Sequence, residues 1–224
     1  MTKPQLTTIT TRAGREATAM VALPDKTPAP GMALFHAFLG LTQEFIDFAE
    51  FYASKDYIAV APDFYNGETT RDFDAAYALM GAMDEEVCTD MAVSWVDWMR
   101  AHDGCSGRVG TVGWCLGGTW SLNTSVATPI DASVVYYGSV AKTKDALSAL
   151  RGPVLGHFGT QDEYFGKDMV NAFEVKMDKA GKPYADHWYE ADHAFANTGG
   201  AHYHEESAEL ADTRTFKFFE EHLT

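Results

Sequence analysis

Short apolar runs alternate with amphipathic stretches along most of the chain. Segments 31–38, 57–64 and 153–158 are almost continuously apolar, which is typical of strands buried on both faces. Segments 116–127 and 167–180 follow strands and repeat apolar residues at helical spacing. Repeated strand–helix units favour a parallel sheet with crossover helices. We therefore expect an α/β fold with a mostly parallel central sheet and helices on both faces.

The rest of the chain continues this alternation. We expect further strands at 6–11, 16–23, 108–114, 132–137 and 185–190, and further helices at 42–55, 84–102, 142–150 and 204–222. No repeat, low-complexity tract or linker interrupts the pattern, so a single domain over residues 1–224 is expected. Cys88 is expected in a helix and Cys105 in a loop.

The charge balance narrows the classes of partner. Seventeen basic against 32 acidic residues give a formal net charge of −15. Such a chain repels phosphate backbones, so nucleic-acid binding is not expected, and it offers no general attraction to anionic substrates. The polar N-terminal segment lacks a signal-peptide core, and no apolar run is long enough to cross a membrane. Three cysteines without C-x-x-C spacing fit a reducing compartment, and a cytoplasmic location is expected.

The most specific local motif is GWCLGG at 113–118, between an expected strand and an expected helix. This is the context of a nucleophile elbow, in which a tight strand-to-helix turn holds the nucleophile above the sheet. The usual central residue is serine, and here it is Cys115. A thiolate attacks acyl carbon well, and the N-terminus of the following helix favours negative charge. A buried structural cysteine is the alternative.

Two later residues can complete a triad with Cys115. Enzymes with this elbow place the nucleophile, the acid and the histidine in that order along the chain. Asp162 follows the strand at 153–158, and His193 follows the last strand. His193 is expected to act as the base, and Asp162 is expected to orient it. Asp192 is a rival acid by proximity in the sequence alone.

Two backbone N–H groups are needed to form an oxyanion hole. The elbow predicts one at Leu116, the residue after the nucleophile. The other is expected in the loop at 36–40, where we choose Phe38.

The other histidines carry weaker signals. His202 and His204 form an H-x-H pair, but no carboxylate or thiol cluster completes a metal site, and none is expected. His36 is expected to be a pocket wall or a support of the site, and His157 to be packed within a strand. No nucleotide-binding motif is present, so no cofactor is expected.

Taken together, the motifs resemble the dienelactone hydrolase family, from about residue 31 to the C-terminal helix. The resemblance rests on FHAFLG (35–40), APDFY (61–65), VGWCLGG (112–118), VVYYG (134–138), TQD (160–162), WYEADHAFA (188–196) and RTFKFF (214–219). It implies a compact α/β-hydrolase fold that needs no cofactor. It also implies a Cys-His-Asp triad, which carries over to Cys115, His193 and Asp162, with Phe38 and Leu116 as oxyanion donors.

Three positions depart from the family pattern. Ala37 stands where the family has a glutamate that contacts the resting thiol. Asn197 stands where the family has an arginine after the histidine. A second arginine of the family is matched by Phe73, with Arg71 nearby but out of register. The resemblance places Tyr77 and Tyr137 at aromatic positions of the substrate pocket.

These departures predict a change of substrate. Without the two arginines, an anionic lactone should bind poorly, because arginine holds carboxylates by charge-assisted hydrogen bonds. We expect an enzyme that hydrolyses neutral esters or lactones, aromatic ones among them. Its pocket would be lined by Phe38, Tyr77, Trp114, Tyr137 and Phe195. Without the glutamate, Cys115 and His193 are expected to rest as a thiolate–imidazolium pair.

Other functions fit the same residues. A thioesterase, or a promiscuous hydrolase of activated esters including phosphorus esters, would use the same triad. A ligand-binding protein or a thiol redox sensor on the same fold is the non-enzymatic alternative. The state of assembly is expected to be a monomer or a small homo-oligomer.

Overall fold

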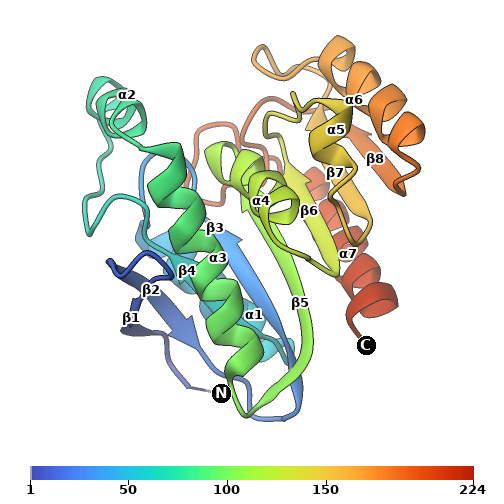
Figure 1. Cartoon of the computed structure of the whole chain (residues 1–224). Helices are drawn as coiled ribbons and strands as arrows, with labels where there is room; N and C mark the ends of the chain where they lie inside the picture. Colours follow the sequence, from blue (N-terminus) through green and yellow to red (C-terminus); the bar gives the residue numbers. More distant parts are fainter. Residues whose placement is uncertain (1) are drawn as a thin grey trace. The chain divides into compact units, whose positions relative to one another are not determined.

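The computed structural model describes residues 2–224, which form eight strands and seven helices (Figure 1). The strands are β1 (Gln5–Thr10), β2 (Glu16–Ala22), β3 (Ala29–Phe35), β4 (Ile58–Pro62), β5 (Cys105–Trp114), β6 (Ala132–Tyr136), β7 (Val154–Gly159) and β8 (Tyr184–Tyr189). The helices are α1 (Gln43–Ser54), α2 (Phe73–Gly81), α3 (Glu85–Ala101), α4 (Leu116–Ala127), α5 (Lys144–Leu147), α6 (Lys167–Ala180) and α7 (Glu205–Leu223).

The chain divides into two compact units at Gly110. In the first unit, β1 pairs antiparallel with β2, β2 pairs antiparallel with β4, and β4 pairs parallel with β3. Helix α1 packs on β4, and α3 packs on β3 and β4. All five residues of β4 are buried, which explains its uninterrupted apolar sequence.

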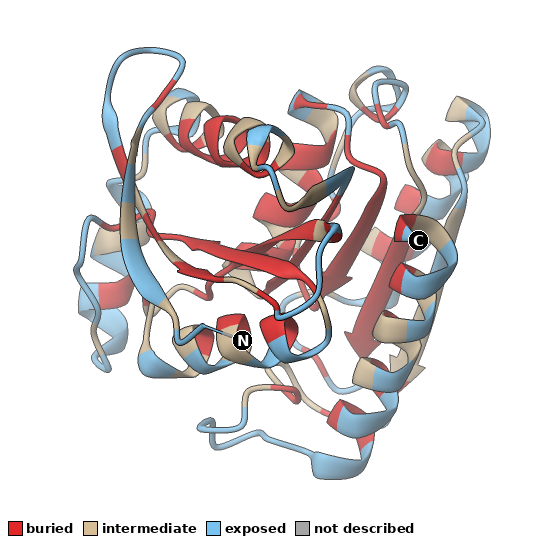
Figure 2. Ribbon diagram, turned by 90° about the horizontal axis from the view of Figure 1, so that it is seen from below, coloured by how far each residue is buried: buried red, intermediate tan, exposed pale blue. Residues whose placement is uncertain are grey.

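In the second unit, β6, β7 and β8 form parallel pairs. Neighbouring residues of a strand point to opposite faces of the sheet. Val135 and Phe158 belong to an apolar cluster that includes residues of α4 and α6. Tyr136, next to Val135, and His157, next to Phe158, point to the other face and hydrogen-bond to side chains of α7. Helices therefore cover both faces of these strands, and every residue of β6 and β7 is buried (buried residues are red in Figure 2).

Strand β5 belongs to both units, and the strand order is β1-β2-β4-β3-β5-β6-β7-β8. The prediction of an α/β fold with a mostly parallel sheet is confirmed. A single domain over residues 1–224 remains a prediction. Within residues 2–224, no helix has both the length and the apolar character of a membrane span.

Most expected bounds differ from the observed ones by a few residues, and two of these differences have a clear physical reason. The strand expected at 31–38 begins at Ala29 and ends at Phe35, because Gly40 donates its backbone N–H to the carbonyl of Ala37 and the chain turns there. Cys105, expected in a loop, is the first residue of β5. The residues from Ser106 to Arg108 are exposed, so no apolar pattern marks this part of the strand.

Candidate active site

The turn between β5 and α4 holds Cys115 in a strained conformation. The strand ends at Trp114 and the helix begins at Leu116, as predicted, and Cys115 between them has a φ of 57° and a ψ of −116°. A non-glycine residue with positive φ is uncommon and costs about 1–3 kcal/mol. The backbone is crowded here, because a Cβ on Gly113 would lie 2.0 Å from the carbonyl oxygen of Gly117. This is the geometry expected of a nucleophile elbow.

The backbone of the neighbouring strand fixes this turn. Cys115 donates its N–H to the carbonyl oxygen of Tyr136 over 3.0 Å. A Cβ on Gly118 would lie 2.7 Å from the same oxygen, so a glycine is needed for α4 to approach β6 so closely. The thiol of Cys115 is partly exposed at the first turn of α4, where the free N–H groups of the helix favour negative charge.

Asp162 lies in the turn that follows β7 and its side chain is buried. Its Oδ1 accepts backbone N–H groups from Tyr164 (2.7 Å) and Phe165 (3.1 Å). Its Oδ2 accepts a hydrogen bond of 2.8 Å from Nδ1 of His193. Although burial alone would raise the pKa of this carboxyl, the interactions with His193 and the two N–H groups lower it below its ordinary value. Asp162 is therefore held as a carboxylate facing the imidazole.

His193 lies in the loop after β8 and bridges two partners. A carboxylate only accepts hydrogen bonds, so Nδ1 of His193 carries a proton toward Asp162, and the ring also hydrogen-bonds to the side chain of Cys115. Burial by itself lowers the pKa of His193, but its interactions with Asp162 and Cys115 raise the pKa to about 9. The structure thus brings together the three residues of the predicted triad, all within the second unit.

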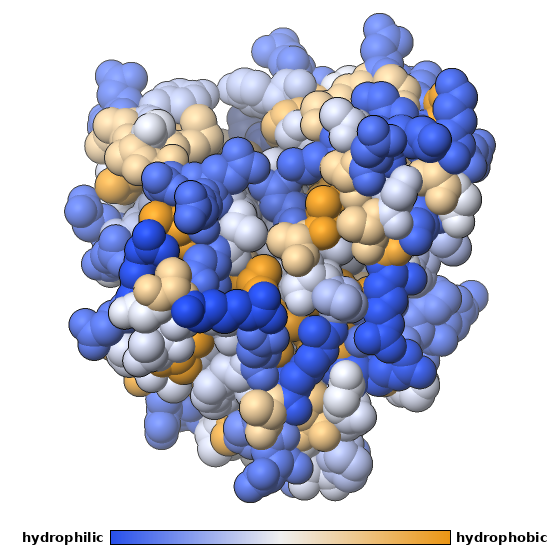
Figure 3. All heavy atoms as spheres, viewed as in Figure 1, coloured by the Kyte–Doolittle hydropathy of each residue, from blue (hydrophilic) through white to orange (hydrophobic). Residues whose placement is uncertain are grey.

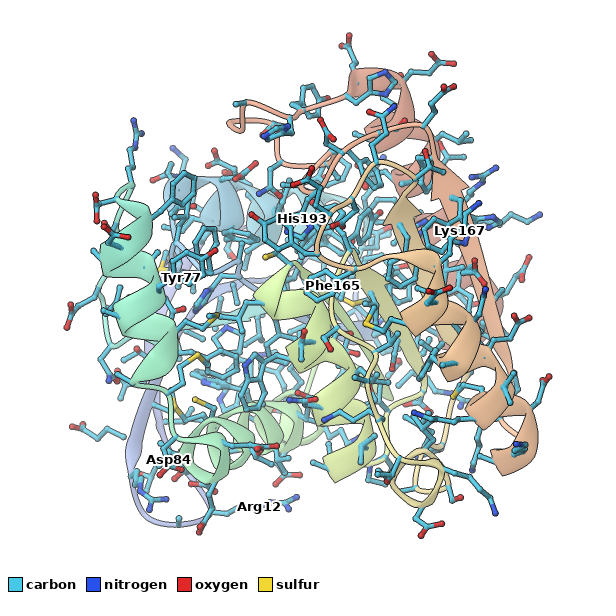
Figure 4. The ribbon with its side chains drawn as sticks, turned by 90° about the horizontal axis from the view of Figure 1, so that it is seen from above. Arg12, Tyr77, Asp84, Phe165, Lys167 and His193 are labelled. Atoms are coloured by element: carbon cyan, nitrogen blue, oxygen red, sulfur yellow. The ribbon has the colours of Figure 1, made fainter. Side chains whose placement is uncertain are left out.

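Aromatic rings surround the imidazole of His193. Tyr137 (5.2 Å between ring centres), Tyr164 (5.0 Å) and Phe165 (5.7 Å) all contact it. Figure 4 shows His193 and Phe165 side by side. The sequence pattern did not lead us to Tyr164 and Phe165, although two aromatic residues two and three positions after the predicted acid were a usable signal. Tyr164 is 67% exposed, so its ring lies between one side of the imidazole and the solvent.

The predicted pocket residues of the second unit pack against different partners. Tyr137 has a φ of 35° and donates its hydroxyl hydrogen to Oδ1 of Asn197 over 2.9 Å. Phe195 is buried against Tyr137, with ring centres 5.2 Å apart. Trp114 is buried and stacks on Tyr136 at 5.4 Å. Contact of these side chains with a substrate remains a prediction.

The predicted residues of the first unit gather around the loop after β3. Phe38 stacks on Phe73 (5.6 Å, 5° between planes) and contacts Tyr77 at 5.7 Å. Phe73 and Tyr77 are exposed on α2, Arg71 is exposed just before α2, and Ala37 is buried. The aromatic side chains expected to line a pocket thus form a partly exposed cluster.

His36 supports this loop from inside. It is fully buried, its Nδ1 donates to the carbonyl oxygen of Ala37, and its Nε2 accepts the N–H of Phe64. Burial lowers the pKa of His36, in agreement with a neutral ring. His36 therefore holds the backbone next to Phe38, which matches the supporting role expected for it.

The other candidates have partners away from the triad. Asp192, the rival acid, pairs with His202 at 3.1 Å, and His204 bonds to Ser207 at 2.8 Å. His157 is buried within β7, as expected. Among residues 2–224, no group of three or more His, Cys, Asp or Glu side chains could hold a metal ion.

Comparison with known proteins gives consistent matches. The model of the dienelactone hydrolase family matches residues 17–223. Carboxymethylenebutenolidase 1 of Cupriavidus pinatubonensis is 25% identical over 219 residues, which cover 93% of each chain. Carboxymethylenebutenolidase of Pseudomonas putida is 28% identical over 211 residues, 89% of each chain. A crystal structure from Klebsiella pneumoniae, assigned as a dienelactone hydrolase, has a TM-score of 0.87 at 25% identity and covers 96% of this chain and 97% of that chain.

The family match spans nearly the whole chain, including the elbow and both partners of Cys115. The fold and the sequence lead to the same assignment. This chain belongs to the dienelactone hydrolase family and is a hydrolase of esters or lactones.

Proposed function

We propose that this protein hydrolyses neutral carboxylic esters or lactones through a covalent acyl-cysteine, with Cys115 as nucleophile, His193 as base and Asp162 as the group that orients His193. The observation that carries the proposal is the continuous contact from Asp162 through His193 to Cys115. Asp162 fixes the tautomer and the direction of the imidazole, which then faces the thiol with its other nitrogen.

The chemistry follows from these contacts. His193 takes the thiol proton before substrate binds, which gives a thiolate–imidazolium pair, and the sulfur of Cys115 then attacks the carbonyl carbon of the substrate. The developing oxyanion accepts the N–H of Leu116, at the first turn of α4. The alkoxide leaves with the proton from His193, which gives the acyl-cysteine. His193 then removes a proton from water, the hydroxide attacks the acyl carbon, and the thiol and a carboxylic acid are released.

The preference for neutral substrates rests on the side chains around the triad. The rings that contact His193 are uncharged, and Asn197 places an amide beside Tyr137. An amide N–H donates to a carbonyl or an ether oxygen without the charge pairing that a carboxylate needs. Comparing hydrolysis of a neutral aryl ester with that of dienelactone tests this part; a clear preference for dienelactone would overturn it.

The triad is tested by hydrolysis of p-nitrophenyl acetate and butyrate. Wild type should turn over both esters, and Cys115→Ala and His193→Ala should lose about three to six orders of magnitude in kcat. Cys105→Ala is the matched control, because Cys105 lies at the start of β5. Its sulfur hydrogen-bonds to the backbone of Gly107 and Arg108, two and three residues further along the chain. Equal rates for all four proteins would contradict the proposal.

A further inference from the structure

Five side chains of the second unit form a continuous row of hydrogen bonds. We call this row the Asp212 relay; its members are Asp212, Tyr136, Thr215, His157 and Tyr189. The bonds are Tyr136 to Asp212 (2.9 Å), Tyr136 to Thr215 (2.7 Å), Thr215 to His157 (2.9 Å) and His157 to Tyr189 (2.8 Å). Tyr136, His157 and Thr215 are fully buried, so the row has little access to water.

Counting hydrogens fixes the direction of every bond. The carboxylate of Asp212 only accepts, so Tyr136 spends its one hydroxyl hydrogen there. The contact between Tyr136 and Thr215 must then use the hydrogen of Thr215. Thr215 has no second hydrogen, so Nε2–H of His157 donates to it.

The other end of the row follows in the same way. Burial lowers the pKa of His157 well below its ordinary value, so the ring is neutral and its Nδ1 is an acceptor. Tyr189 therefore donates its hydroxyl hydrogen to Nδ1. Arg214, whose guanidinium lies 5.4 Å from the ring centre of Tyr189, supplies a hydrogen bond to the same hydroxyl. A cation and an anion thus terminate a row of bonds that all point one way.

Three members of the relay hold the backbone that carries the triad. The carbonyl of Tyr136 accepts the N–H of Cys115 (3.0 Å), and the carbonyl of Tyr189 accepts the N–H of Thr160, two residues before Asp162 (2.8 Å). The carbonyl of His157 accepts the N–H of Tyr137 (2.7 Å), whose ring contacts His193. Each of these carbonyls belongs to a residue whose side chain is a member of the relay.

We propose that the Asp212 relay positions the triad: the carboxylate of Asp212 sets the direction of the hydrogen bonds and the tautomer of His157, and the relay keeps β6, β7 and β8 in the register that aligns Cys115, Asp162 and His193. Its members are positioning residues and do not touch the substrate. The role in catalysis rests on the proposed function of the triad. Hydrogen bonds in such a row polarise one another, so loss of one weakens the others.

The charge on Asp212 is available at neutral pH. Burial raises the pKa of Asp212 to about 6, although its hydrogen bond with Tyr136 opposes this shift. Tyr136 from β6 hydrogen-bonds to this carboxyl, and the charge of Asp212 contributes to raising the pKa of Tyr189 from β8 and of Tyr203 from the loop before α7. Asp212 is therefore ionised above about pH 6, and the relay has its defined direction there.

The direct test is the tautomer of His157, read at pH 7.5 from long-range proton–nitrogen correlations of histidine-labelled protein. We expect the proton on Nε2. A proton on Nδ1 would overturn the direction derived for the relay. This measurement needs no substrate, so it stands even if aryl esters are not hydrolysed.

The second test removes the central hydroxyl with Thr215→Val. We expect kcat for p-nitrophenyl acetate to fall about five- to a hundred-fold with KM almost unchanged, because sub-ångström to 1 Å displacements of reacting groups cost rates of that order. Alkylation of Cys115 by iodoacetamide, followed by peptide mass spectrometry, should slow as well. Thr213→Val is the matched control, because Thr213 is exposed on the same helix and its hydroxyl donates to the carbonyl of Glu209 within α7.

The outcomes separate the two proposals. If Thr215→Val matches wild type and Thr213→Val in both kcat and alkylation, the relay does not position the triad. If wild type does not hydrolyse esters, the proposed function fails, and the alkylation rates still decide on the relay. Should Thr215→Val not fold, Tyr189→Phe removes the donor to Nδ1 of His157 and is expected to give the same losses.

Discussion

His193 combines a buried position with two partners that favour its charged form. The ring hydrogen-bonds to Asp162 and to Cys115, and these contacts outweigh burial and raise its pKa to about 9. An imidazolium that is stable at neutral pH is a poor base for a neutral thiol but a good partner for a thiolate. The contacts of His193 therefore favour a thiolate–imidazolium pair at rest, in which Cys115 is the preformed nucleophile and His193 the preformed acid.

Alkylation of Cys115 against pH tests this pair. A raised histidine pKa means that the imidazolium is present at low and neutral pH and is lost as pH rises through about 9. We expect Cys115 to react with iodoacetamide at a substantial rate already at pH 6–7. His193→Gln should move the onset upward. An onset in wild type only near pH 8.5, the ordinary pKa of a free cysteine, would contradict the pair.

Asp162→Asn tests the orienting role. Asparagine keeps the shape, but its amide can turn an N–H toward the imidazole and favour the wrong tautomer. We expect kcat for p-nitrophenyl acetate to fall by about 10³- to 10⁴-fold. Asp192→Asn is the matched control, since Asp192 directly precedes His193 in the sequence and pairs with the exposed His202. If kcat falls no further in Asp162→Asn than in Asp192→Asn, Asp162 is not the residue that orients His193.

At the scale of elements, the close packing of β5, α4 and β6 builds the elbow. Gly113 and Gly118 are crowded by backbone atoms, which cannot move aside as a flexible side chain can. Replacing Gly113 with alanine would place its Cβ 2.0 Å from a carbonyl oxygen. The turn at Cys115 can then persist only if α4 shifts from β5.

Gly113→Ala is expected to lower both stability and activity. We predict a loss of about 2 kcal/mol or more in the free energy of unfolding, in the range of overpacked or strained sites, and a kcat reduced at least ten-fold. Urea denaturation and the aryl ester assay measure the two effects. Gly81→Ala is the control, because Gly81 has no atom within 4 Å of a built Cβ and no positive φ. Unchanged stability and kcat in Gly113→Ala would mean that the elbow tolerates a side chain there.

Local sequence patterns predicted the helices on either side of the site well. The expected helices at 116–127 and 167–180 coincide with α4 and α6, because each begins after a turn and ends at a clear boundary such as Gly181, which has a φ of 67°. The order of the triad along the chain was predictable too. Its contacts and the raised pKa of His193 depend on distances that no local pattern contains.

The Asp212 relay shows why the rest could not be predicted. His157 and Thr215 are 58 residues apart, and Tyr136 and Thr215 are 79 apart. Their side chains meet because β6 and β7 turn alternate residues toward α7. In the sequence, His157 is only a histidine within an apolar strand. A buried polar network of this kind is visible once the packing of the sheet is known.

At the scale of the whole molecule, the formal net charge of −15 acts on every charged substrate. Figure 3 shows a face on which hydrophilic residues predominate. The negative potential of such a surface lowers the local concentration of an anion, and salt screens it, since the Debye length falls from about 30 Å at 0.01 M to about 10 Å at 0.1 M. The charge therefore adds to the uncharged surroundings of His193 in disfavouring anionic esters.

Two esters with the same leaving group test this effect. We expect kcat/KM for mono-p-nitrophenyl succinate, which carries a carboxylate, to rise about two- to five-fold between 10 and 300 mM NaCl, because screening removes repulsion. The value for neutral p-nitrophenyl acetate should stay level, which controls for general effects of salt on the enzyme. A fall with salt for the succinate ester would mean that a local cation attracts the carboxylate. That outcome would reverse the inferred preference for neutral substrates and leave the triad untouched.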